Sequence, residues 1–126
     1  MGKGYLIDSN AIIDFFNKSL PESGRNLLFT IAPVISIVTF IEIFSSNKAS
    51  AQEIKELQRF SDVATIYNVD HNIALITIEL RKKYKIKLPD ALIAATAIFY
   101  NLVLITRNVS DFEKIKGLEI VNPYSA

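Results

Sequence analysis

Four acidic residues lie in or beside apolar segments, where an isolated charge is unexpected. They are Asp8 after residues 5–7, Glu42 after residues 37–41, Asp90 before residues 91–95, and Asp111 shortly after residues 102–105. Carboxylates are rarely buried without a partner, and none of these apolar segments contains a lysine or arginine. If the fold brings the four together, either bound protons or a divalent cation must offset their repulsion. The second option predicts a metal-dependent enzyme.

The available ligand types restrict which metal this would be. Carboxylate oxygens select Mg²⁺ or Mn²⁺, whereas zinc normally recruits histidine or cysteine. The chain has no cysteine and one histidine, His71, which we interpret as a polar residue at a helix start. A partly filled octahedral shell leaves positions for water and a substrate phosphate. The ion can then lower the pKa of the bound water and stabilise an in-line displacement, so phosphodiester hydrolysis is the natural reaction.

Each carboxylate also has a purely structural interpretation. Asp8 could cap the following helix, Asp90 could complement a helix dipole, Glu42 could point to solvent, and Asp111 could be a turn residue. These alternatives stay open for each residue taken singly. Convergence of all four at one edge of the fold is what the catalytic hypothesis requires.

Composition indicates a single domain over residues 1–126. Half of the residues are hydrophobic and the formal net charge is only +1, so a role with nucleic acid needs a local basic patch. We expect a cytoplasmic protein, because no targeting segment is visible and the apolar stretch 91–105 is shorter than the ~20 residues that cross a bilayer.

The hydrophobic pattern predicts strands alternating with helices. Strands are expected at 5–8, 34–37, 63–69, 102–106 and, at an edge, 118–121; helices are expected at 11–16, 21–29, 39–46, 50–60, from a cap at Asp70 to about residue 84, and 89–100. This alternation is typical of a mainly parallel sheet with helices on both faces. Such sheets bind ligands at the carboxyl ends of their strands. Asp8 and Asp111 follow strand ends, and Glu42 and Asp90 are expected in first helical turns.

Four stretches of the chain, in order, resemble the PIN-domain ribonucleases, in particular the VapC-type toxins of toxin–antitoxin pairs. They are residues 6–10, 36–42, 88–97 and 104–112. The most specific part is Pro89-Asp90-Ala91-Leu92-Ile93-Ala94-Ala95, and Ser9 stands where many relatives carry threonine. The resemblance implies a three-layer α/β/α fold with a mainly parallel central sheet of four to five strands.

The same resemblance implies a Mg²⁺- or Mn²⁺-dependent endoribonuclease. Its metal ligands would be Asp8, Glu42, Asp90 and Asp111, with Glu42 acting directly or through water. Asn108 lies in the loop of Asp111 and competes with it for the fourth position. Asn10, Thr106 and Asn108 are expected to orient the ligands by hydrogen bonds, although Asn10 could equally be a helix cap.

RNA must still be attracted to this acidic edge. The densest basic run consists of Arg81, Lys82, Lys83, Lys85 and Lys87, and Arg107 adjoins the last motif. These six residues are candidate phosphate contacts. Alternatively, the run complements a helix dipole and stays solvated. Tyr84 and Tyr100 could stack bases, with core or dimer packing as the alternative for Tyr100.

The partners implied by the resemblance are an RNA substrate, a cognate antitoxin whose tail blocks the groove, and a second copy of the chain; no membrane is involved. A phosphatase is disfavoured, because Asn10 stands where its second aspartate would be. The remaining rival is a catalytically silent PIN-like domain that binds RNA or protein. The RNA cut, the antitoxin's identity and the choice between one and two metal ions are left open.

Overall fold

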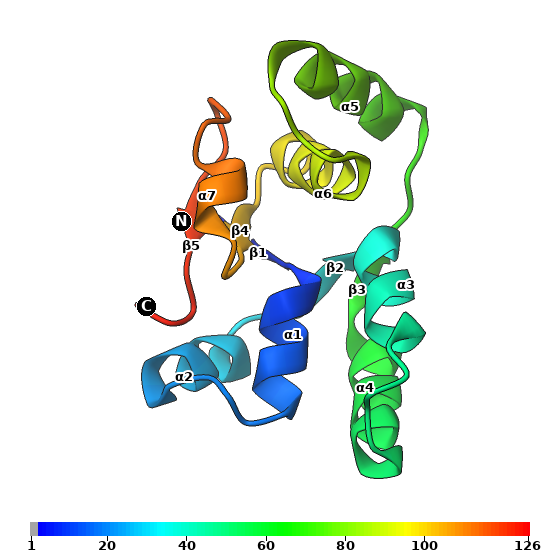
Figure 1. Cartoon of the computed structure of the whole chain (residues 1–126), viewed down its shortest axis with the longest axis vertical. Helices are drawn as coiled ribbons and strands as arrows, with labels where there is room; N and C mark the ends of the chain where they lie inside the picture. The colour runs from blue at the N-terminus through cyan, green and yellow to red at the C-terminus, as the bar shows by residue number, and fades with distance from the viewer. Residues whose placement is uncertain (1–2) are drawn as a thin grey trace.

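The computed structural model describes residues 3–126, and at its centre lie short strands paired in parallel as a three-stranded and a two-stranded sheet (Figure 1). Strand β1 (Tyr5–Ile7) pairs with β4 (Val103–Ile105), which pairs with β5 (Ile120–Val121). Strand β2 (Val34–Ser36) pairs with β3 (Thr65–Tyr67) and lies beside β1. The expected parallel sheet is therefore confirmed, in hydrogen-bonded groups of three and two strands.

Seven helices surround the sheet in the described chain. They are α1 (Ser9–Phe16), α2 (Glu22–Thr30), α3 (Ile37–Ser45), α4 (Ala51–Val63), α5 (His71–Lys83), α6 (Leu88–Phe99) and α7 (Val109–Phe112). Helices α5 and α6 pack against each other on one side, and α1 packs with α3 and α4 on the other (Figure 1). The arrangement is the layered α/β fold that the alternating pattern predicts.

Adjacent strand residues contribute to different cores. Leu6 and Leu104 belong to the apolar cluster with α5 and α6, whereas Ile7 and Ile105 belong to the cluster with α1, α3 and α4. Successive side chains in a strand point to opposite faces of the sheet. Because both faces are covered, the strands are hydrophobic throughout rather than alternating with polar residues.

Helix starts follow local capping chemistry. Asp70 caps α5 as predicted, with Oδ1 accepting from the Ile73 amide at 2.9 Å. Ser50 and Glu53 form a reciprocal capping box at the start of α4. Ser36 Oγ accepts from the Val38 amide at 3.1 Å, so α3 begins two residues earlier than predicted.

Four sequence predictions need correction. Helix α1 begins at Ser9, two residues earlier than predicted. The early start of α3 places Glu42 in its second turn rather than its first. Helix α4 continues to Val63, where a strand was expected to begin, and α7 forms in a segment expected to be a loop. Among residues 3–126, none of the helices combines the length and apolar composition that crossing a bilayer requires.

Candidate active site

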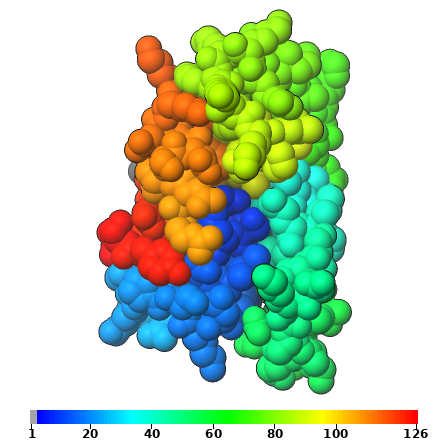
Figure 2. Space-filling model, viewed as in Figure 1, coloured from blue at the N-terminus to red at the C-terminus, as the bar shows by residue number. Residues whose placement is uncertain are grey.

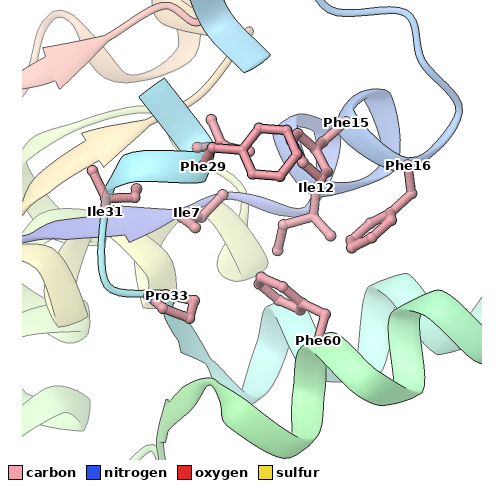
Figure 3. A pocket seen from close by; sticks show the side chains of 9 residues that line it. Ile7, Ile12, Phe15, Phe16, Phe29, Ile31, Pro33 and Phe60 are labelled. Carbon is pink, nitrogen blue, oxygen red and sulfur yellow. The ribbon is translucent and has the colours of Figure 1, made fainter. Parts of the chain in front are cut away.

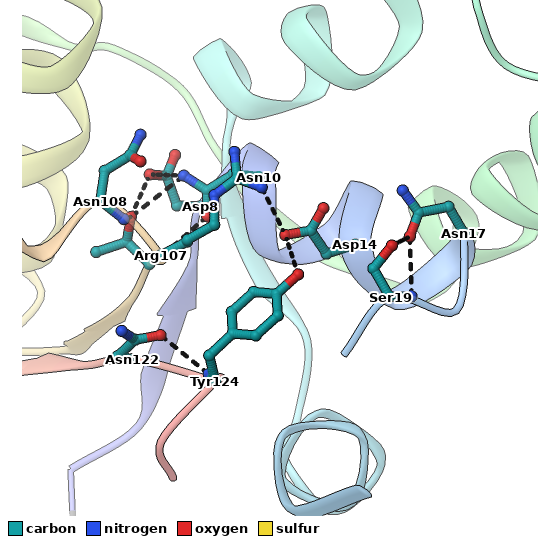
Figure 4. Close-up of polar contacts among 10 residues, drawn as sticks. Asp8, Asn10, Asp14, Asn17, Ser19, Arg107, Asn108, Asn122 and Tyr124 are labelled. Atoms are coloured by element: carbon teal, nitrogen blue, oxygen red, sulfur yellow. Dashed lines mark hydrogen bonds and ion pairs between the residues drawn. The ribbon is translucent and has the colours of Figure 1, made fainter. Parts of the chain in front are cut away.

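Asp8 lies at the carboxyl end of β1 and is almost completely buried, with 3% of its surface exposed. Its Oδ1 accepts from the Ser9 amide at 2.8 Å, so it caps α1. Its Oδ2 accepts from the Thr106 hydroxyl at 2.9 Å and from the Asn10 amide nitrogen at 3.1 Å (Figure 4). The capping role considered from the sequence is therefore real, and it falls to Asp8 rather than to Asn10.

The donors around Asp8 are all neutral, and none of the ion pairs found in residues 3–126 includes it. Burial raises the pKa of the Asp8 carboxyl, and the negative charge of Glu42 raises it further, whereas the hydrogen bonds from Thr106, Ser9 and Asn10 lower it. A charged, buried carboxylate without a cation costs free energy. Asp8 thus provides an electrostatic site for a positive ion.

Asp90 lies in the first turn of α6, after Pro89, where a negative charge also complements the helix dipole. Burial raises the pKa of its half-buried carboxyl. The charges of Asp8 and Asp111 raise this pKa further, and Lys87 opposes them. Asp90 is therefore close enough to both aspartates for their charges to act on it.

Glu42 and Asp111 lie on opposite flanks of this pair. Glu42 is partly exposed in the second turn of α3 and acts on Asp8, while Asp111 is exposed in α7 and acts on Asp90. The charge of one predicted acid therefore acts on the next, from Glu42 to Asp8 and from Asp8 and Asp111 to Asp90, near the carboxyl edge of the sheet. The charge of Asp111 acts on Asp90, whereas the backbone of Asn108 binds Thr106, so the structure leaves their competition for the fourth position open.

Thr106 connects the ends of β1 and β4. It is fully buried, donates to Asp8, and accepts from the Asn108 backbone amide at 3.1 Å and from the Asn10 side chain at 3.3 Å. Asn10 also accepts from the Arg107 backbone amide through Oδ1, at 2.9 Å. The three predicted orienting residues thus belong to one network around Asp8, with Asn108 contributing its backbone N–H (Figure 4).

The donor set fits a hard divalent cation that keeps part of its water shell. Within residues 3–126, no group of three or more acidic or histidine side chains is placed so that it could hold a metal ion, so any ion here would take at most two protein ligands. Mg²⁺ usually keeps several waters and is bound by one or two carboxylates together with substrate phosphates. Asp8 and Asp90, with raised pKa values and no ion-pair partner, match this mode of binding.

The predicted basic run divides between two surfaces. A cavity of about 410 Å³ is lined by Arg81, Lys85, Ile86, Lys87, Asp90, Asp111 and Lys114, which we call the basic groove. Lys82 instead pairs with Glu79 at 3.6 Å, and Lys83 lines a different hollow beside Leu75 and Tyr84. Sequence reasoning missed Lys114, although it follows Asp111 by only three residues.

Arg107 forms an ion pair within the protein. Its Nη1 lies 2.9 Å from Oδ2 of the buried Asp14, and the Tyr124 hydroxyl donates to the same oxygen at 2.9 Å (Figure 4). Figure 2 shows the carboxyl-terminal segment packed against α2 and the segment after β4. A Cβ at Gly24 of α2 would lie 2.1 Å from the Pro123 carbonyl oxygen, so only glycine allows this approach. Sequence reasoning did not identify Asp14.

The two candidate stacking tyrosines are both engaged in packing. Tyr100 stacks on Tyr67 with ring centroids 3.7 Å apart and an interplanar angle of 8°. The Tyr84 hydroxyl accepts from the Lys116 amide at 3.2 Å. His71 is exposed at the start of α5, consistent with its interpretation as a helix-start polar residue.

A second cavity, of about 230 Å³, lies on the α1 and α2 side and is apolar (Figure 3). We call it the apolar pocket; it is lined by Ile7, Ile12, Phe15, Phe16, Leu28, Phe29, Ile31, Pro33 and Phe60. Phe29 is 73% exposed at its rim, and Ile7 directly precedes Asp8 in the chain. Exposed apolar surface of this kind is typical of protein–protein contacts.

The chain is similar to known proteins over most of its length. The family model of the PIN domain matches residues 5–118. The chain is 32% identical over 123 residues to Ribonuclease VapC1 of Methanocaldococcus jannaschii, which covers 91% of this chain and 85% of that protein.

Among solved structures, a toxin–antitoxin complex from Klebsiella pneumoniae contains a chain that is 38% identical, with a TM-score of 0.79 and coverage of 96% of this chain and 98% of that one. A chain of VapBC2 from Rickettsia felis, bound to a DNA fragment from its promoter, is 27% identical, with a TM-score of 0.77 and coverage of 94% and 97%.

Proposed function

The chain belongs to the PIN-domain family, and on this premise we propose that it is an endoribonuclease that hydrolyses RNA phosphodiester bonds, the toxin of a toxin–antitoxin pair. Its cofactor is Mg²⁺ or Mn²⁺. One observation carries the proposal: the buried Asp8 has no cationic partner among residues 3–126, the charge of Glu42 acts on it, and its own charge acts with that of Asp111 on Asp90. A hard dication at this edge relieves their repulsion.

The four acids and their hydrogen-bonding partners have different proposed roles. Asp8 and Asp90 would hold the metal, and the hydrogen bonds from Thr106 and Asn10 fix the orientation of the Asp8 carboxylate. When bound, the ion lowers the pKa of a coordinated water and neutralises charge on the phosphoryl oxygens. Glu42 is partly exposed beside Asp8, where it would orient the attacking water. Asp111, or Asn108 in its place, completes the acidic edge.

The neutral hydrogen-bond donors around Asp8 affect whether its carboxyl group is charged. A metal ligand must be deprotonated, whereas burial favours the neutral acid and raises the pKa of Asp8. The hydroxyl of Thr106 and the amide of Asn10 stabilise the charged form of Asp8 without occupying the carboxylate as a lysine ammonium group would. They therefore oppose the effect of burial on the Asp8 pKa and leave the carboxylate available for the ion.

The partners follow from the relatives and from exposed apolar surface. The matched chains from Klebsiella pneumoniae and Rickettsia felis come from a toxin–antitoxin complex and from VapBC2. We propose a cognate antitoxin whose tail blocks the basic groove beside the acids and whose apolar side chains bind in the apolar pocket at Phe29.

We also propose a homodimer, because Ile41, Leu75 and Ile78 remain 49% to 58% exposed. Light scattering of the purified chain tests the dimer.

The activity is tested with purified protein and structured RNA, with Mg²⁺ or Mn²⁺ and with excess chelator. Metal-dependent cleavage that is lost in Asp8→Asn and in Asp90→Asn is expected. Mapping the 5′ ends of the products would then identify the sequence that is cut. RNA binding without cleavage, independent of metal and unchanged in both variants, would instead identify a catalytically silent RNA-binding domain.

A further inference from the structure

We propose that the basic groove holds the backbone phosphates of the RNA strand beside the catalytic edge, through Arg81, Lys85, Lys87 and Lys114. This inference rests on the proposed nuclease function and deepens it. The groove contains Asp90 and Asp111 in its own wall, so a strand lying in it reaches the acids that bind the metal. The assignment adds Lys114 as an RNA contact and excludes Lys82 and Lys83.

The groove is built from three separate parts of the chain. Arg81 lies in the last turn of α5, Lys85 and Lys87 lie in the connection to α6, and Lys114 follows α7. Lys114 Nζ donates to the Lys85 carbonyl oxygen at 2.5 Å, which holds the two walls together. Figure 2 shows the orange segment around α7 bordering the yellow-green connection between α5 and α6. The basic side chains therefore meet through tertiary structure.

The groove is lined by more positively than negatively charged side chains, so it favours an anion. None of its four cationic residues takes part in the ion pairs found in residues 3–126, although Lys87 lies near enough to Asp90 to lower its pKa. All four are exposed, and the formal net charge of the chain is only +1, so this is a local concentration of positive charge. If a dication neutralised Asp90 and Asp111, the four cations would face the groove without an acidic partner among the described residues. Phosphodiesters are the anions that the nuclease must hold.

Dipole compensation explains only part of the basic run. Arg81, Lys82 and Lys83 all lie in the last turn of α5, where positive charge complements the helix dipole. Lys85, Lys87 and Lys114 lie outside that helix, yet they line the groove. Lys82 pairs with Glu79, and Lys83 lines another hollow. Lys82 and Lys83 are therefore matched controls, with the same charge a few residues away on a different surface.

The test compares double variants that remove the same charge. Lys85→Gln with Lys114→Gln is compared with Lys82→Gln with Lys83→Gln, both in an Asp8→Asn background that binds without cutting. The probe is a short single-stranded RNA of mixed sequence, and the readouts are the Kd and its dependence on salt. For the groove pair we expect Kd to rise about tenfold and the salt slope to become shallower by about 1.4, which is two phosphate contacts on a single strand. The control pair should stay within about twofold.

A second groove pair guards against a structural effect. Lys114 also makes a hydrogen bond to Lys85, so Arg81→Gln with Lys87→Gln is measured in parallel, and thermal melts identify any variant that fails to fold. Equal losses in groove and control pairs, no measurable RNA binding, or groove-dependent binding of polyglutamate in preference to RNA would each overturn the assignment. If RNA binding depends on the groove but the wild type does not cleave RNA, the phosphate-binding role of the groove is supported and the nuclease function is rejected. Failure of this inference can therefore be told apart from failure of the proposed function.

Discussion

The Thr106 hydroxyl donates to Asp8 Oδ2 at 2.9 Å, across 98 residues of sequence. The contact joins the carboxyl ends of β1 and β4, which are paired in parallel with Ile7 opposite Ile105. Because the residue after each strand end lies at the same edge of the sheet, the register of two apolar strands determines the position of this hydrogen bond.

Removing the hydroxyl with Thr106→Val should lower RNA cleavage by about 10- to 100-fold, as expected when a group that orients a metal ligand is lost. The loss of this donor should also raise the pKa of Asp8 further, because the hydrogen bond stabilises the charged form. The pH–rate profile should therefore move to higher pH. Thr106→Ser keeps the donor and should retain most of the activity. A uniform loss of rate with no shift in the profile would mean that Thr106 acts only in packing.

As the pH is lowered, RNA cleavage should be lost at a higher pH than the titration of ordinary carboxyl groups would produce. The pKa of Asp8 and of Asp90 is raised above the usual value of 3.8, and only the deprotonated forms bind the metal. Higher metal concentration should move the midpoint to lower pH, because metal and protons compete. Measuring kcat/KM against pH at two Mn²⁺ concentrations tests this. A midpoint that ignores metal concentration would contradict the competition.

Asp90→Asn should leave the metal-free protein as stable as the wild type or more stable. The folded-state pKa of Asp90 is raised, so its contribution to stability is present below the unfolded value near 3.8 and is lost as pH rises through the folded value. The stability difference between variant and wild type should therefore grow with rising pH across that window. Melts in chelator at several pH values provide the measurement. A large loss of Tm in the variant would show that Asp90 is structural.

Adding Mn²⁺ or Mg²⁺ should raise the Tm of the wild type, since a ligand that binds only the folded state stabilises it. Asp8→Asn and Asp90→Asn should each reduce this increase. Glu79→Gln, a change of the same kind at an acid outside the site, serves as the control. Equal increases in all four proteins would locate the bound metal elsewhere.

The ion pair of Asp14 and Arg107 should matter for stability rather than for RNA affinity. Asp14→Asn weakens a pair in which a buried carboxylate accepts from Arg107 and Tyr124, at an expected cost of about 1 to 3 kcal/mol. Tyr124→Phe should cost less, because one neutral hydrogen bond is lost. Urea denaturation measures both. If Arg107 contacts RNA instead, Arg107→Gln in the Asp8→Asn background will make the salt dependence of RNA binding shallower.

The sequence contained most of the fold and the nature of the chemistry. Continuous apolar strands, capping residues such as Asp70, and acids placed directly after or before apolar runs are local features, and local features follow the periodicity of helices and strands. The family prediction, the parallel sheet and the edge strand β5 are confirmed. Whether the four acids bind a metal remains a prediction; the fold places them near enough for the charge of one to act on the next.

Tertiary structure alone decided which charged residues meet. Arg81, Lys82 and Lys83 are adjacent and all positively charged, yet of these three only Arg81 lines the groove, where Lys114 joins it from a distant segment. Arg107 looks free in sequence but is held by Asp14, 93 residues away. Side-chain direction on a helix and the packing of one segment against another set these contacts. Both depend on the whole fold, because a long polar side chain binds whichever partner the surrounding elements bring within its reach.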